Sequence, residues 1–249
     1  MIELVDVHKS FGDQKVLDGL NLTIPEGRIT VLLGGSGSGK SVTLKHIIGL
    51  LKPDRGKVLV DSEDITKVSE WRLNQIRKKF GMLFQEAALF DSMSVLENVA
   101  FPLIEHTKKP WDEIVRIARE KLAQVELEGA ENKFPSELSG GMKKRVGLAR
   151  AIILEPKILL CDEPTSGLDP IVGDAITELL VNMQRRLGVT MFIISHDIDM
   201  ALKIADQIAF LHGGRIVFVG TPKEAMESDN PFVQQFIRRT ASHMDRREG

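Results

Sequence analysis

The chain has 249 residues, of which 43% are hydrophobic, enough for one large α/β domain or two small ones. Its 33 basic residues nearly balance its 35 acidic ones, so a net charge of −2 gives no sign of a nucleic-acid-binding surface. One cysteine, Cys161, excludes an intramolecular disulfide, and no apolar run approaches the ~18 residues of a membrane span. Because Met1–Leu4 does not begin a signal peptide, we expect a soluble protein that stays where it is made.

Two strands are predicted at the amino terminus. Residues 2–7 and 16–24 alternate between apolar and polar side chains, and Gly12-Asp13 between them is typical of a hairpin turn. We therefore expect an antiparallel N-terminal sheet.

The segment Gly34–Ser41 fits the pattern G-x-x-x-x-G-K-[ST] of a nucleotide-binding P-loop. An aliphatic strand at 29–33 precedes it, and a helix with an apolar face follows it, which argues against an incidental Gly/Ser turn. Small residues let backbone N–H groups wrap the phosphates, while Lys40 holds the β- and γ-phosphates and Ser41 ligates Mg²⁺. The predicted nucleotide contacts are Gly34, Gly35, Ser36, Gly37, Ser38, Gly39, Lys40, Ser41 and Val42.

Strand and helix patterns continue to the end of the chain. A strand near 58–60, a helix at 71–79 and a strand at 82–84 are expected to continue an α/β core. From Ser94 to Ile153 the pattern becomes helical, which predicts an inserted helical subdomain. The strands and helices expected after it lie at 158–161, 170–187, 190–194, 198–205, 208–211 and 216–219.

Two acidic residues end the strand at 158–161. Asp162 and Glu163 would lie at its carboxyl end beside the nucleotide, where Asp162 would hold Mg²⁺ and Glu163 would polarise the attacking water. The alternative is a pair of solvated acids that cap a strand.

A second phosphate-binding helix start is predicted at 138–142. Ser139 is a plausible N-cap, and Gly140 and Gly141 expose backbone donors. The segment resembles the L-S-G-G-Q signature of ATP-binding cassette proteins, and it precedes the Asp162-Glu163 strand as that family requires. Met142 replaces the usual glutamine, which affects side-chain contacts only.

Other positions match the family in order. Gln85 resembles the Q-loop glutamine, which can reach Mg²⁺ or water, and 166–169 resembles the D-loop, whose Asp169 can position a partner subunit. His196 resembles the switch histidine that contacts the γ-phosphate; a structural histidine is the alternative. With Lys40 and Glu163, Gln85 and His196 complete the catalytic set that the resemblance implies, and the implied metal ligands are Ser41, Gln85 and Asp162.

Adenine recognition in this family uses an aromatic ring, usually tyrosine, before the second strand. The chain has no tyrosine, so Phe11 is the predicted substitute, because a phenyl ring can still stack on a purine. The alternative is that Phe11 only fills the hydrophobic core.

The resemblance covers nearly the whole chain and implies an α/β fold. The expected architecture is a P-loop NTPase core of the ABC ATPase type, with an N-terminal antiparallel β subdomain and an inserted α-helical subdomain. Residues 1–85 and 157–230 would form the catalytic core, 86–156 the helical subdomain and 231–249 a C-terminal tail.

Three features resemble the ATPase of Mla-type, Mce-associated lipid transporters. They are the sequence from Gln85 to Leu103, the methionine in the signature, and Gly167, where most transport ATPases carry alanine. In such systems the segment from Gln85 to Leu103 borders the groove that receives the permease's coupling helix. Ala88, Leu89 and Phe90 would suit that contact. Burial of Phe90 in the insert's own core is the alternative.

The resemblance therefore implies an ATPase subunit of a bacterial lipid transporter, using ATP and Mg²⁺. It would work as a homodimer on two integral permease subunits, at the cytoplasmic face of the inner membrane, without nucleic acid. An Mce-domain protein and a small regulatory subunit are further candidate partners. Rival functions are amino-acid import, lipoprotein release, cell division, or non-transport work on DNA or ribosomes.

The tail after Pro231 carries a local charge of +2. Two readings remain open for it, a contact with the second ATPase subunit and a solvated helix end. Its charged residues are Arg238, Arg239, Asp245, Arg246, Arg247 and Glu248.

Overall fold

The computed structural model describes residues 1–244, with side chains described as far as Arg238. The chain divides into two compact units: unit 1 comprises Met1–Arg77 with Thr190–Gly249, and unit 2 comprises Lys78–Val189. The predicted helical subdomain lies within unit 2. Of the tail's charged residues, Arg239, Asp245, Arg246, Arg247 and Glu248 lie outside the described side chains. None of the helices in the described part of the chain has the length and apolar character of a membrane span.

The amino terminus of unit 1 forms the predicted antiparallel sheet. Its strands follow the order β2-β1-β4-β5, and β1 and β2 meet at the predicted turn, where Gly12 has φ 57°. The strand near 58–60 was predicted to continue the α/β core, but it pairs antiparallel with β1 instead. Its half-buried alternation suits a sheet with one solvated face. The bounds are β1 Ile2–Phe11, β2 Gln14–Ile24, β4 Arg55–Val60 and β5 Glu63–Asp64.

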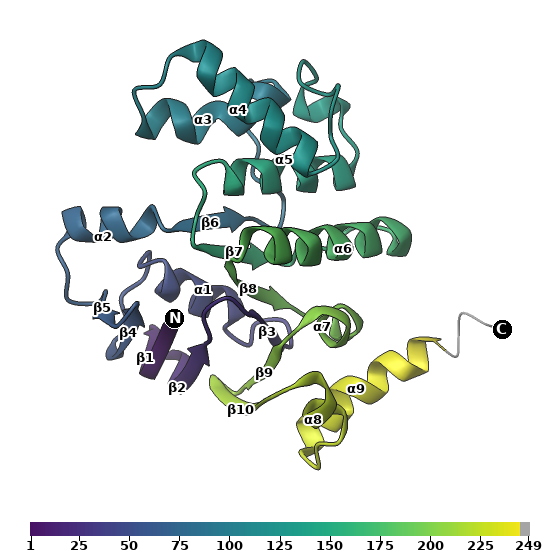
Figure 1. Ribbon diagram of the computed structural model, residues 1–249. Coiled ribbons are helices and arrows are strands. Elements are labelled where there is room, and N and C mark those ends of the chain that lie inside the picture. The colour runs from purple at the N-terminus through teal and green to yellow at the C-terminus, as the bar shows by residue number, and fades with distance from the viewer. Residues whose placement is uncertain (245–249) are drawn as a thin grey trace. The chain divides into compact units, whose positions relative to one another are not determined.

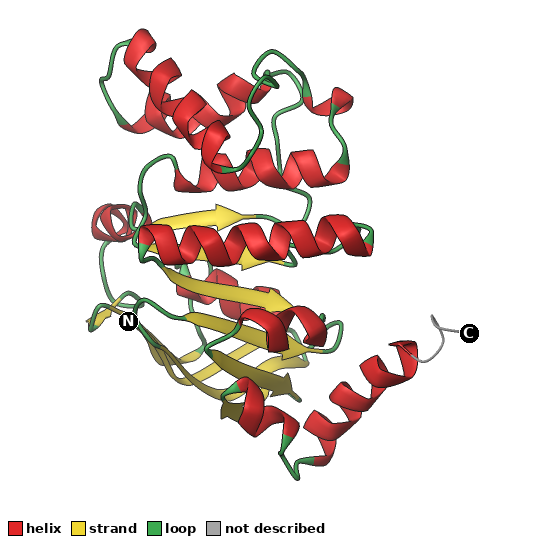
Figure 2. Cartoon of the chain, turned by 45° about the vertical axis from the view of Figure 1, so that its right-hand side comes forward, coloured by secondary structure: helices red, strands yellow, loops and turns green. Residues whose placement is uncertain are grey.

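The second sheet of unit 1 places β3 between β8 and β9, parallel to both, with β10 antiparallel to β9 (Figure 2). All residues of β3 and β8 are buried, as expected for parallel strands covered on both faces. Helix α1 packs on β3 and β8, and α7 packs on β3. The bounds are β3 Ile29–Gly34, α1 Lys40–Ile47, α2 Glu70–Arg77, β8 Thr190–Ser195, α7 Ile198–Ile204, β9 Gln207–His212, β10 Arg215–Gly220, α8 Pro222–Met226 and α9 Pro231–Met244.

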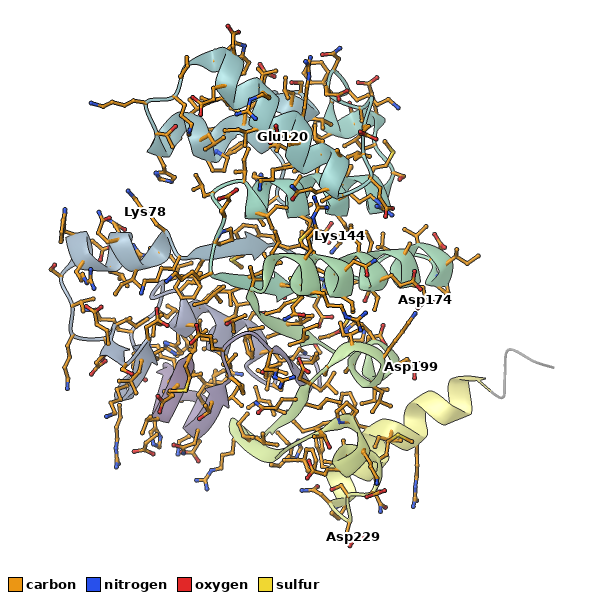
Figure 3. The ribbon with its side chains drawn as sticks, in the orientation of Figure 1. Lys78, Glu120, Lys144, Asp174, Asp199 and Asp229 are labelled. Atoms are coloured by element: carbon orange, nitrogen blue, oxygen red, sulfur yellow. The ribbon has the colours of Figure 1, made fainter. Side chains whose placement is uncertain are left out.

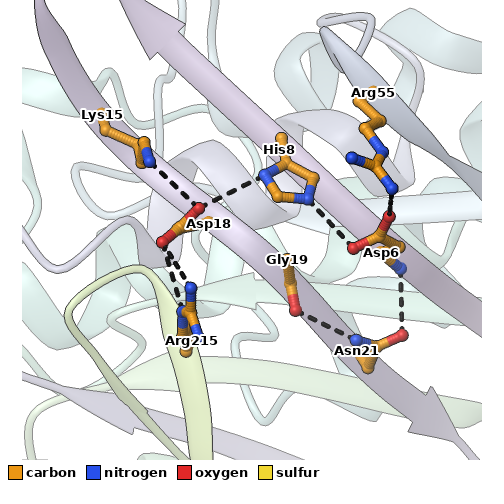
Figure 4. Close-up of polar contacts among 8 residues, drawn as sticks. All are labelled: Asp6, His8, Lys15, Asp18, Gly19, Asn21, Arg55 and Arg215. Carbon is orange, nitrogen blue, oxygen red and sulfur yellow. Dashed lines mark hydrogen bonds and ion pairs between the residues drawn. The ribbon is translucent and has the colours of Figure 1, made fainter.

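A polar network fastens β1, β2 and β10 to one another (Figure 4). The β1 backbone bulges at Asp6, whose φ is 50°, and the Asp6 carboxylate contacts His8 Nε2 at 3.0 Å and Arg55 at 3.1 Å. The other ring nitrogen of His8 lies 3.4 Å from Asp18. Arg215 donates two hydrogen bonds to Asp18, and these hold the pKa of that carboxyl below its ordinary value. The network thereby fixes the two strands that lead into the turn beside Phe11.

Unit 2 combines a parallel strand pair with helices. Strand β6 runs parallel to β7, and α3, α4 and α5 pack against one another (Figure 1). Ile114, Ala118, Leu122 and Val125 form a buried stripe, which faces this helical core. Helix α5 also packs closely on β6, where a Cβ on Gly81 would lie 2.2 Å from the Ala151 oxygen. The bounds are β6 Phe80–Leu83, α3 Val95–His106, α4 Trp111–Gln124, η1 Pro135–Glu137, α5 Gly140–Ile152, β7 Ile158–Asp162 and α6 Pro170–Leu187.

A buried amide holds the loop that precedes α3. The Asn98 side chain is fully buried, and its Oδ1 accepts a hydrogen bond from the Phe90 N–H at 2.8 Å. Its Nδ2 donates to the backbone oxygens of Phe90, Met93 and Ser94 at 3.0–3.1 Å. One side chain thus bonds to four backbone groups, of which the Phe90 and Ser94 oxygens also accept from backbone N–H groups.

We expect Asn98→Ala to lower the free energy of unfolding by about 1–3 kcal/mol, because it removes the side chain that bonds to the Phe90 N–H and the Met93 oxygen. Urea unfolding of the full chain measures this change. Asn132→Ala, at an exposed position of the same unit, is the matched control and should change stability little. If both variants unfold at the same urea concentration as the unmodified chain, Asn98 does not have this role.

Candidate functional site

The phosphate loop of unit 1 joins β3 to α1 through tightly packed glycines. A Cβ on Gly34 would lie 2.6 Å from Ser38 Oγ and 2.7 Å from the Leu211 oxygen. Gly39 precedes α1 with φ 107°, and a Cβ there would lie 2.9 Å from Leu17 Cδ2. No side chain caps the start of α1, and the positive end of the helix dipole there favours an anion.

The side chains of this loop fit a phosphate ligand. Lys40 is 9% exposed and its Nζ donates to the oxygens of Gly34 at 2.8 Å and Gly35 at 3.3 Å, which aims the ammonium into the loop. The buried hydroxyl oxygen of Ser38 makes no hydrogen bond. Ser41 is exposed at the start of α1, where its hydroxyl could serve a cation beside the phosphates. The loop therefore combines a buried cation and an unpaired hydroxyl with a helix start that no side chain caps.

Two more predicted residues belong to unit 1. His196 follows β8, and because Leu33 pairs in register with Ser195, it comes directly after the strand end beside the phosphate loop. Phe11 ends β1 with 48% of its surface exposed and the Lys9 ammonium 5.6 Å from its ring centre. An aromatic ring this exposed is not part of the hydrophobic core.

Unit 2 brings the other predicted residues to one end of its strand pair. Leu83 pairs in register with Cys161, so Gln85 and Glu163 each follow by two residues at the same strand end. Gln85 is exposed, Asp162 is half-buried, and Glu163 is 9% exposed with φ 47°. Burial raises the pKa of the neighbouring Cys161 thiol to about 12, because the thiolate would lie in the core.

Helix α5 of the same unit begins as predicted. Ser139 is its N-cap, and the Ser139 hydroxyl accepts a hydrogen bond from the Met142 N–H at 3.3 Å. A Cβ on Gly140 would lie 3.0 Å from Leu168 Cδ2, and one on Gly141 would lie 2.5 Å from Val172 Cγ1. Both glycines are thus required by the close approach of 166–172.

The D-loop residues have structural roles of their own. Asp169 is the N-cap of α6, and its carboxylate accepts from the Val172 N–H at 3.1 Å. Gly167 has φ 76°, a conformation that favours glycine.

Sequence reasoning missed the residue that links these elements. Lys144 of α5 is 5% exposed, and its Nζ donates to the backbone oxygens of both Gln85 and Glu163. The detectable signal was its place on the buried stripe Gly141, Lys144, Leu148, where an apolar residue is expected.

The predicted site residues therefore form two groups, one in each unit. Unit 1 holds the phosphate loop, Phe11 and His196, and unit 2 holds Gln85, Ser139, Gly140, Gly141, Asp162 and Glu163. Among the described residues, no cluster of three or more His, Cys, Asp or Glu side chains could hold a metal. A Mg²⁺ bound together with nucleotide phosphates needs only one or two carboxylates. The Asp162 carboxylate in unit 2 and the Ser41 hydroxyl in unit 1 are each oxygen donors of the kind that Mg²⁺ accepts.

Known ATP-binding proteins resemble this chain in sequence. Residues 17–166 match the ABC transporter family model. The chain is 48% identical over 236 residues to the probable ribonucleotide transport ATP-binding protein mkl of Mycobacterium tuberculosis, covering 95% of this chain and 66% of that protein. It thus spans slightly less than two thirds of this relative's length. It is 41% identical over 237 residues to MlaF of Escherichia coli, the ATP-binding protein of an intermembrane phospholipid transport system, covering 95% and 88% respectively.

A solved structure shares the fold. The dimeric bacterial ABC transporter cassette MJ0796 superposes with a TM-score of 0.82 at 35% identity, covering 89% of this chain and 99% of that one. The same cassette is also known as a dimer in a post-hydrolysis state with ADP and phosphate. The predicted fold class, an ABC ATPase core, is confirmed, and the chain belongs to the ABC transporter family.

Proposed function

We propose that this chain binds and hydrolyses ATP as the ATPase subunit of a phospholipid transporter. The observation that carries the proposal is the phosphate loop: close-packed glycines, the buried Lys40 ammonium and the uncapped start of α1 together match the shape and charge of a nucleotide's phosphates. Family membership supports the same chemistry.

Each predicted residue then has a role. Lys40 binds the β- and γ-phosphates, Phe11 stacks on the adenine, and His196 contacts the γ-phosphate. Ser41, Gln85 and Asp162 would hold Mg²⁺, which supplies charge neutralisation at the phosphate oxygens when bound. The list of nucleotide-contacting residues is completed by Gly34, Gly35, Ser36, Gly37, Ser38, Gly39 and Val42.

Glu163 is the proposed general base. A carboxylate at the end of a buried strand can accept a proton from the attacking water, and its burial keeps competing solvent away. The backbone of Glu163 is held by hydrogen bonds to its oxygen, so the carboxylate starts from a fixed position.

A second copy of the chain completes the proposed site. Ser139, Gly140 and Gly141 offer the start of α5 to the phosphates of ATP bound to the other copy's P-loop. The dimers of the MJ0796 cassette support this arrangement.

The proposed permease contact lies between β6 and α3. Ala88 and Phe90 are exposed, Leu89 is half-buried, and the Phe90 ring packs against Phe101 in a tilted arrangement, with centroids 4.9 Å apart and 53° between the ring planes. A ring that is 42% exposed yet fixed by a neighbour suits an interface anchor. The permease would hold this subunit at the cytoplasmic face of the membrane, with an Mce-domain protein and a regulatory subunit as further partners.

Phospholipid is the proposed cargo, and ribonucleotide is the rival. The name of MlaF gives phospholipid as the cargo of its transport system, and the name of mkl gives ribonucleotide as a probable cargo. We favour phospholipid because this chain and MlaF match over most of both lengths, whereas a third of mkl has no counterpart here.

The loop geometry predicts a contrast between two glycines. Gly34→Ala should weaken ATP binding by at least ~10-fold, about 1.4 kcal/mol, because its Cβ would displace Ser38 or the Leu211 backbone. Gly173→Ala, in α6, is the matched control, since a Cβ there would make only ordinary contacts with Thr165, at 3.8 and 4.0 Å. Calorimetric titration of each variant with ATP measures the difference. Equal affinities in the two variants would contradict the assigned loop geometry.

The function itself predicts ATP-dependent transfer of labelled phospholipid by the complete complex in proteoliposomes. The complex with Glu163→Gln is the matched control: it should bind ATP but lose transfer, because a positioned base contributes on the order of 10²- to 10⁴-fold to turnover. Transport of ribonucleotides or amino acids without lipid transfer would overturn the cargo and leave the ATPase assignment intact. Full transfer with Glu163→Gln would exclude Glu163 as the base.

A further inference from the structure

The buried cation of α5 joins two sequence-distant backbone segments of unit 2. Lys144 lies in the second turn of the helix (Figure 3), and its Nζ donates to the Gln85 oxygen and, at 2.9 Å, to the Glu163 oxygen. These acceptors lie 59 and 19 residues away from it in sequence. A single ammonium group therefore sets the separation between the two backbones.

Lys144 is placed as a hydrogen-bond donor to these two backbones. Burial lowers the pKa of its ammonium, although the nearby carboxylates of Glu86, Asp162 and Glu163 act in the opposite direction. An apolar side chain of similar shape would leave both backbone oxygens without this donor. The position thus requires a donor that helix packing alone does not supply.

Both acceptor segments have unusual backbone conformations. Glu163 has φ 47°, in the left-handed region that non-glycine residues rarely adopt. Ala87 and Ala88, which follow Gln85, have φ 58° and 47°, and Arg150 of α5 donates to the oxygens of both. Such conformations persist where surrounding contacts over-determine them, and α5 supplies those contacts.

Helix α5 approaches the same loop without a side chain at Gly147. A Cβ there would lie 3.0 Å from Leu83 Cδ1 and 3.2 Å from the Ala87 Cβ. The helix therefore touches the end of β6 and the Gln85 segment at 144, 147 and 150. A shift of the helix would carry the Gln85 backbone with it.

We propose that Lys144 is a positioning residue for ATP hydrolysis, which ties the backbones of Gln85 and Glu163 to the helix whose first residues bind phosphate. The inference rests on the proposed function, because it takes Gln85 and Glu163 as the groups that act on the attacking water. When phosphate binds at Ser139, Lys144 transmits the resulting position of α5 to both groups. In this role Lys144 acts through Gln85 and Glu163 and not on the nucleotide itself.

The test is the steady-state ATPase rate of Lys144→Met, measured as kcat and KM separately. Loss of the two hydrogen bonds should lower kcat by about 10- to 100-fold, as expected for a small misplacement of reacting groups. The KM for ATP should change less than about threefold, because the phosphate loop lies in unit 1. Lys144→Arg should restore most of kcat, since its fork can also donate to two oxygens.

Lys121→Met is the matched control. Lys121 is 6% exposed, belongs to α4 of the same unit, and pairs with Glu155 at 3.3 Å. We expect Lys121→Met to lower the stability of the chain, as we expect of Lys144→Met, and to leave kcat unchanged. An equal loss of kcat in both variants, or no rescue by Lys144→Arg, would reduce Lys144 to a structural residue. If Lys144→Met does not fold, Lys144→Gln, which still donates an amide N–H, should show an intermediate kcat; an unchanged kcat in that variant would overturn the proposal.

Glu163→Gln in the same assay separates the two hypotheses. If it is inactive while Lys144→Met keeps kcat within twofold of the unmodified chain, only the positioning role fails. If Glu163→Gln hydrolyses ATP normally, the assignment of Glu163 is wrong and the role of Lys144 falls with it.

Discussion

Hydrogen bonds from buried side chains to backbone oxygens hold the segment between β6 and α3, and the chemistry proposed for unit 2 depends on them. Lys144 and Arg150 reach this segment from α5, and Asn98 reaches it from α3. The segment begins with Gln85 and includes Phe90, the proposed permease contact. Because the helices hold its backbone, a movement of α5 changes the position of Gln85 and of the exposed surface together.

In unit 1 the backbone of the phosphate loop is itself the proposed binding group. A nucleotide's phosphates need several N–H donors in a small space, and side chains would obstruct them. Gly34 and Gly39 allow the loop to close against Leu211 and Leu17 while Lys40 stays buried beneath it. The fully buried strands β3 and β8 fix both ends of this arrangement, since His196 follows the strand that pairs with β3.

The sequence predicted these features where local pattern and chemistry agree. The hairpin at Gly12, the strand before the P-loop and the Ser139 cap each follow from residues next to one another. Strand β4 was assigned to the wrong sheet because its partner, β1, is distant in sequence and strand patterning does not identify partners. Lys144 was missed for the same reason: its acceptors are backbone oxygens, which leave no trace in the residue types.

The central claim is that two copies of the chain share each site for ATP. Lys40→Ala removes the phosphate loop's cation, and Ser139→Arg blocks the start of α5, so each homodimer should be inactive. A mixed dimer, isolated with two different affinity tags, would contain one site with both defects and one intact site. Because one composite site stays intact, this mixed dimer should hydrolyse ATP measurably. A mixed dimer as inactive as both parents would show that the copies do not share their sites.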